Sequence, residues 1–137
     1  MENIQVYRIL KGMDLSEGRS VRVVDDLEAV LMEQHETRTV TDGKLYKHYH
    51  DYLVLLKNGE KAGILLNCDS VDVHAYVLQK YRKQHIVSRL TNNGFLKKIW
   101  PDVDSVTCAD LYNYDKVKHL VEISGLRLRP TGILLED

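Results

Sequence analysis

Positively charged and hydrogen-bonding side chains cluster near the middle of the chain, between a strand pattern and a helix pattern. The cluster reads Gln79-Lys80-Tyr81-Arg82-Lys83-Gln84-His85. A helix N-terminus presents unpaired backbone N–H groups and the positive end of the helix dipole, and both favour a bound anion. The cluster therefore predicts a phosphate site. An ordinary solvated basic face explains the same residues equally well.

The elements that would position this cluster follow from the periods on either side of it. Residues 71–78 alternate with a period of two, which is typical of a half-buried strand. Helical spacing follows in Ile86, Val87 and Leu90, and Asn93-Gly94 is a plausible helix stop. We therefore expect a strand, a basic turn and an amphipathic helix in immediate succession.

The residues from Val77 to Leu90 read VLQKYRKQHIVSRL. This segment resembles motif A of the GNAT superfamily of acetyl-CoA-dependent N-acetyltransferases, roughly V-x-P-x-Y-R-G-x-G-I-G-S-x-L. His85 and Val87 stand where the family has small residues, which let the backbone approach the pyrophosphate. The resemblance implies acetyl-CoA as cosubstrate, and its site would comprise Val77, Arg82, Lys83, Gln84, His85, Ile86, Val87 and Ser88.

Acetyl transfer to an amine needs a base for the amine proton, a donor that polarises the thioester carbonyl and an acid for the leaving thiolate. The resemblance assigns polarisation to a backbone N–H near Val77. Asp72 and His74 share one face of the strand and are candidate bases, or are simply polar residues on its wetter side. The family's tyrosine acid is missing from its position on the last helix, so Tyr112 or Tyr114 would have to replace it.

Two other site chemistries are weaker. His48 and His50 would share a face of any strand they form, but a zinc site needs three or four ligands and no metal site is predicted. The Lys80–Arg89 basic patch is small and lacks interleaved stacking aromatics, so nucleic acid is not an expected partner.

Composition places the chain among soluble globular proteins. It has 137 residues, 44% of them hydrophobic and 28% charged, enough for one domain spanning residues 1–137. Its net charge of −1 creates no long-range field toward nucleic acid or an anionic membrane. There is no apolar run long enough for a membrane span, and the N-terminus is unlike a signal peptide. The two cysteines, Cys68 and Cys108, form no C-x-x-C pair. These features favour a cytoplasmic protein.

The remaining pattern predicts a strand at 3–10, a short strand at 21–24 and a helix that begins at Asp25 and ends near 35–38. Asp42-Gly43 and Asn58-Gly59 are hairpin turns, and Gly63 is a possible bulge in the strand at 61–68. A strand at 105–111 would run parallel to that at 71–78. A helix from Asp115 and short strands at 126–129 and 133–135 would end the chain.

This order is similar to the GNAT fold, an α/β (α+β) domain whose mixed, mostly antiparallel central sheet carries helices on both faces. The resemblance implies an N-acetyltransferase with a small-molecule or peptide amine as acceptor. The alternative is a non-catalytic protein-interaction module of the same fold whose cofactor site has decayed. Only 12 residues follow Gly125, which would leave an open sheet edge for a homodimer to cover.

Overall fold

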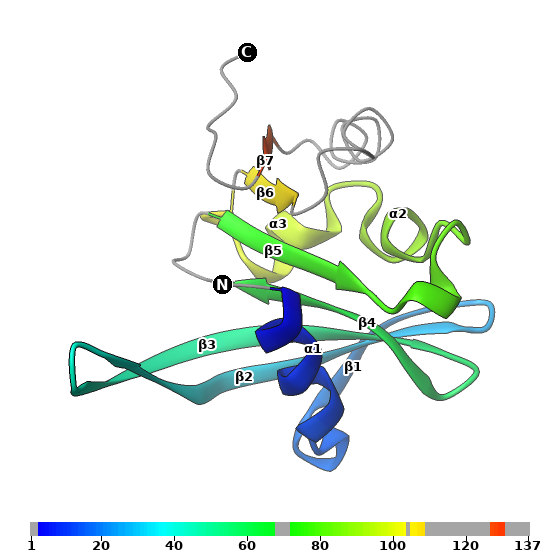
Figure 1. Ribbon diagram of the computed structural model, residues 1–137. Coiled ribbons are helices and arrows are strands. Elements are labelled where there is room, and N and C mark those ends of the chain that lie inside the picture. Colours follow the sequence, from blue (N-terminus) through cyan, green and yellow to red (C-terminus); the bar gives the residue numbers. More distant parts are fainter. Residues whose placement is uncertain (1–2, 68–71, 104, 109–126, 131–137) are drawn as a thin grey trace.

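The computed structural model describes residues 3–67, 72–103, 105–108 and 127–130 (Figure 1). Its main element is a seven-stranded sheet in which neighbours in sequence are neighbours in space. The first five strands are antiparallel, and the last two continue the sheet in parallel. The strands are β1 (Arg19–Val24), β2 (Leu27–Thr41), β3 (Lys44–Lys57), β4 (Glu60–Asn67), β5 (Asp72–Val77), β6 (Ser105–Cys108) and β7 (Arg127–Pro130).

The expected GNAT-like α/β architecture, with helices on both faces of the sheet, is wrong. The described structure is mostly one antiparallel sheet of five strands, and its few helices are short. They are the α-helices α1 (Asn3–Gly12), α2 (Ile86–Thr91) and α3 (Phe95–Ile99) and the 3-10 turns η1 (Leu15–Glu17) and η2 (Gln79–Tyr81). None of the described helices has the length and apolar character needed to span a membrane.

The helix predicted from Asp25 is a long strand, β2. Asp25 instead occupies a tight turn between β1 and β2, with a φ of 53°. The error arises because both faces of the first part of β2 are covered, so apolar residues follow one another without alternation. An apolar run of this kind fits helical spacing as well as a buried strand.

The strand predicted at 3–10 is the helix α1. Its β-branched and aromatic residues suggested a strand, but Val6 and Leu10 are four apart and both are buried. Tyr7 lies on the same helix and packs edge-on against Tyr76 of β5, with ring centroids 6.3 Å apart. The helix therefore packs against the middle of the sheet, next to β4 and β5.

The hairpin predictions are confirmed, because their turns are defined by local sequence. Asp42-Gly43 joins β2 to β3, and Asn58-Gly59 joins β3 to β4. A register shift between β3 and β4 shows a bulge, but the extra residue is Ala62, next to the predicted Gly63. The parallel pairing of the strands that begin at 72 and 105 is also confirmed. The helix from Asp115 and the strand at 133–135 lie outside the described residues.

One part of the sheet projects from the molecule. Pairing between β1 and β2 ends at Leu31, and pairing between β3 and β4 begins at Asp51. Residues 33–50, here called the arm, thus form a two-stranded ribbon (Figure 1). None of its residues is buried, whereas Tyr52 to Leu55 in the adjoining part of β3 form the centre of the core.

Candidate functional site

The predicted anion site lies where the chain leaves β5. The backbone N–H of Leu78 donates to the carbonyl of Ala62 at 2.8 Å, which fixes the end of β5 against β4. The turn η2 follows at once, and its Tyr81 ring is buried. The Tyr81 hydroxyl donates to the Glu60 carboxylate at 2.5 Å. An aromatic anchor therefore holds the basic turn on the β3–β4 hairpin.

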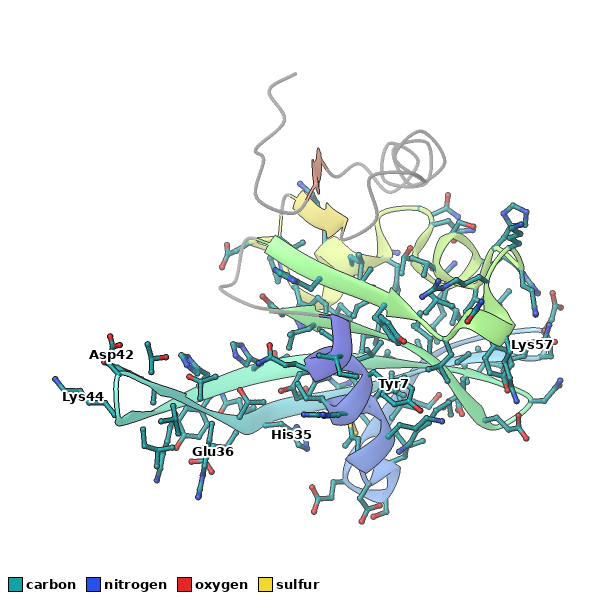
Figure 2. All side chains as sticks on the ribbon, in the orientation of Figure 1. Tyr7, His35, Glu36, Asp42, Lys44 and Lys57 are labelled. Atoms are coloured by element: carbon teal, nitrogen blue, oxygen red, sulfur yellow. The ribbon has the colours of Figure 1, made fainter. Side chains whose placement is uncertain are left out.

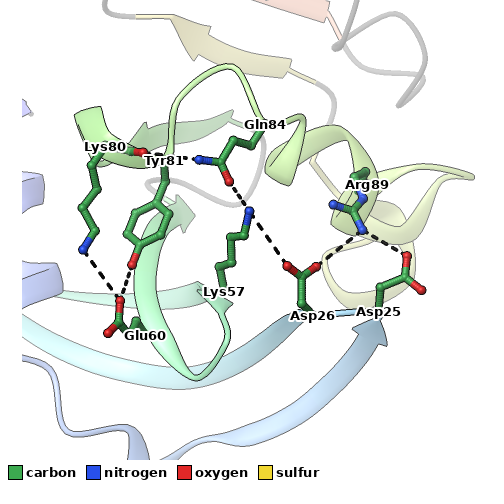
Figure 3. A network of polar contacts seen from close by, with 8 residues as sticks. All are labelled: Asp25, Asp26, Lys57, Glu60, Lys80, Tyr81, Gln84 and Arg89. Carbon is green, nitrogen blue, oxygen red and sulfur yellow. Dashed lines mark hydrogen bonds and ion pairs between the residues drawn. The ribbon is translucent and has the colours of Figure 1, made fainter.

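Carboxylates within the chain neutralise much of the basic cluster (Figure 3). Lys80 pairs with Glu60 at 3.7 Å, and Arg89 pairs with Asp25 at 3.1 Å. A further link runs through Lys57, which donates to the Gln84 side-chain oxygen and lies 3.9 Å from Asp26. These contacts connect the basic turn to the turns that begin β2 and β4. Lys80 and Arg89 thus have a structural role that the sequence pattern alone did not indicate.

The Glu60 contacts also change its protonation. The hydrogen bond from Tyr81 and the charge of Lys80 lower the pKa of Glu60 below its ordinary value of 4.5. Lys80 in turn interacts with Tyr81 and lies near the charge of Glu60, and both contacts raise the pKa of Lys80. Both shifts favour the charged forms, so Tyr81, Lys80 and Glu60 form one coupled contact.

Acid should weaken this contact, and Glu60→Gln tests it. Because the folded-state pKa of Glu60 is depressed below 4.5, its stabilising contribution is present above that pH and is lost as the pH falls through the folded pKa. We expect urea unfolding midpoints of the wild type to fall between about pH 5 and pH 3, and those of Glu60→Gln to fall less. The surface substitution Glu33→Gln serves as control. Identical pH profiles for the wild type and Glu60→Gln would contradict the assignment.

Two cations of the cluster remain available to a ligand. Arg82 and Lys83 are exposed, and neither has a carboxylate partner among the described residues. The Arg82 Nε donates to the Val77 carbonyl at 3.0 Å, and its guanidinium lies 6.0 Å from the centre of the Tyr76 ring. The Arg82 Nη groups therefore stand at the end of β5 with donors to spare.

The helix that follows offers less than the sequence predicted. It has six residues, and its N-cap His85 is exposed, has a φ of 57° and makes no capping bond with its side chain. Ile86 is buried, Val87 packs against the core, and the Ser88 hydroxyl donates to the His85 carbonyl at 3.1 Å. The positions expected to line a phosphate cradle are thus divided between an exposed turn and the core.

Strands β5 and β6 are parallel neighbours just before this turn. Among the described residues, they pair at Asp72, Val73 and His74. The second half of β5, Ala75 to Val77, pairs with β4 alone within the described part of the chain. Arg82 contacts the end of this segment through the Val77 carbonyl.

The candidate catalytic residues are only partly placed. Asp72 and His74 lie two apart in β5, and the structure describes the side chain of His74 but not that of Asp72. His74 is half-buried opposite Leu66 of β4, on the face that Tyr76 and helix α1 also occupy. Tyr112 and Tyr114 lie outside the described residues. The chain thus places one candidate base three positions before Val77.

Arg22 is an important residue that sequence reasoning missed. Its guanidinium donates to the backbone carbonyls of Leu90 and Asn92 at 3.2 and 3.1 Å and to the Asn92 side chain at 2.5 Å. It also stacks over the Phe95 ring at 5.0 Å. These partners lie about 70 residues away in sequence, so no local motif pointed to them. Arg22 attaches the end of α2, and with it the basic turn, to β1.

No protein-family model, curated protein or solved structure matches this chain.

Proposed function

We propose that the chain binds acetyl-coenzyme A along the second half of β5 and transfers the acetyl group to an amine. The exposed Arg82 guanidinium, which contacts the Val77 carbonyl at the end of β5, is the observation that carries the proposal. A strand edge can bind an extended, amide-bearing chain beside such a cation. The pantetheine arm of coenzyme A has two amides and fits that description.

The charges at the end of the edge support the same ligand. Arg82 presents free Nη donors there, and Lys83 follows it in an exposed turn. A guanidinium binds phosphate oxygens through charge-assisted hydrogen bonds. The phosphates would therefore lie toward Arg82 and Lys83, and the thioester would lie along β5 toward His74.

The proposed chemistry uses groups of β5. A backbone N–H of β5 donates to the thioester oxygen, which becomes negative as the amine attacks. His74, or Asp72 two residues before it, accepts the amine proton. The carbon–sulfur bond then breaks, and an acid, for which Tyr112 and Tyr114 are the candidates, protonates the thiolate. The acceptor is a small-molecule or peptide amine.

Calorimetric titration with acetyl-CoA tests the binding step. We expect Arg82→Ala to weaken binding about tenfold, because it removes a charge-assisted phosphate contact. Lys44→Ala, which removes a cation from the far end of the arm, should bind as the wild type does. Undetectable heat from the wild type at millimolar ligand would end the proposal. Equal affinities for Arg82→Ala and the wild type would remove Arg82 from the site.

A second candidate function is protein interaction as a homodimer, and the arm is the observation that favours it. A two-stranded ribbon is marginally stable on its own in water. This one exposes four large hydrophobic side chains, Val40, Leu45, Tyr46 and Tyr49, with exposed fractions of 71%, 55%, 46% and 65%. The mass of the full chain in solution, measured by light scattering after gel filtration, tests this candidate. Monomers at all concentrations would exclude it.

A further inference from the structure

The arm has two open strand edges. Beyond Leu31, β2 has no partner on its outer side within the described residues, and β3 has none there before Asp51 (Figure 2). Open edges are templates for pairing with a further strand. Charged residues occur on both edges, so their order along each strand determines which pairings are compatible.

Only the β2 edge is self-complementary in charge. Glu36 and Arg38 lie on the same face of β2 and are exposed. Antiparallel pairing of this edge with a second copy, centred on Thr37, places Glu36 of each copy opposite Arg38 of the other. Both opposite pairs are favourable across strands. Centring the pairing on Glu36 places the two copies of Glu36 opposite each other, and centring it on Arg38 does the same for Arg38. Both arrangements are unfavourable because like charges face each other.

The β3 edge has no such arrangement. Centring it on Lys47 opposes two lysines, and centring it on Tyr46 or His48 places Lys47 opposite an uncharged residue. His48 and His50 also stack on this strand, with ring centroids 5.9 Å apart, and neither offers a carboxylate to the lysine of a second copy. The β2 edge is therefore the one that suits a second copy.

We propose that two copies of the chain associate through the β2 edges of their arms, antiparallel and with Thr37 at the two-fold axis. This inference deepens the second candidate function and rests on it. The paired segment runs from His35 to Thr39, because Gln34 has a φ of 52° and interrupts the strand there. The resulting four-stranded ribbon stabilises both arms, since each gains a further strand.

Charge exchange tests the register. The wild type should be a dimer by sedimentation velocity. Glu36→Arg and Arg38→Glu should each raise its dissociation constant at least about tenfold, because each creates two like-charge pairs. The double variant E36R/R38E should restore dimerisation. Lys44→Glu, on the same arm but away from the paired edge, should leave it unchanged.

A cysteine at the axis gives an independent test. Two copies of Thr37→Cys would face each other across the axis at a separation that permits a disulfide. Oxidation should crosslink this variant, whereas Lys44→Cys should remain uncrosslinked beyond the wild-type background. If the wild type is a dimer, three results would overturn the register and leave the interaction role intact. They are single variants that dimerise as the wild type does, a double variant that is not rescued, or the absence of a crosslink. A monomeric wild type overturns both.

Discussion

Replacing Gly63 by valine is expected to lower the free energy of unfolding by about 3 kcal/mol, through overpacking between β4 and β5. A Cβ atom at Gly63 would lie 2.8 Å from the Tyr76 carbonyl oxygen and 3.3 Å from the Val77 side chain. The nearer atom belongs to the backbone and cannot rotate away. One of the two strands must therefore shift, and urea unfolding at neutral pH measures the cost.

The same variant connects the fold to the proposed site. Tyr76 and Val77 belong to the β5 segment that we propose as the acetyl-CoA edge, so Gly63→Val should also weaken acetyl-CoA binding. Gly12→Ala is the matched control, because a Cβ there meets nothing within 4 Å. Its unfolding free energy should stay unchanged or rise by up to about 1 kcal/mol, since alanine favours a helix over glycine. Wild-type stability of Gly63→Val would show that the two strands are not in close contact.

Sequence reasoning succeeded where a few neighbouring residues decide the conformation. Asp42-Gly43 and Asn58-Gly59 provide the positive φ values that tight hairpin turns require, and both turns formed as predicted. It failed for α1 and β2, because the choice between helix and strand depended on burial by distant parts of the chain. The incorrect architecture followed from these two elements together.

The candidate site shows the same limit. The cations from Lys80 to Arg89 were recognisable in the sequence, but their partners were not. Asp25, Asp26 and Glu60 reach them only because three turns meet at one end of the sheet (Figure 3). Charge clusters in a sequence therefore overstate the charge available to a ligand. Here the cations available to a ligand are reduced to Arg82 and Lys83 among the described residues.

Replacing Arg22 by alanine is expected to cost about 3 kcal/mol of unfolding free energy. The half-buried guanidinium makes three hydrogen bonds to the end of α2 and covers the Phe95 ring. Alanine leaves the carbonyls of Leu90 and Asn92 without these donors and removes the aliphatic stem that packs there. Urea unfolding at neutral pH measures the loss.

Arg22→Lys separates charge from geometry. Lysine keeps the positive charge near the C-terminus of α2 but lacks the planar fork that reaches the Leu90 and Asn92 carbonyls together. We therefore expect it to recover less than half of the alanine loss. Full recovery would mean that charge alone is required. Because Arg22 holds α2, and the basic turn leads directly into α2, hydrogen exchange in residues 79–91 should rise in both variants. Unchanged exchange there would show that the turn is held by its own ion pairs, with Glu60 and Asp25, and not by the attachment of α2 to β1.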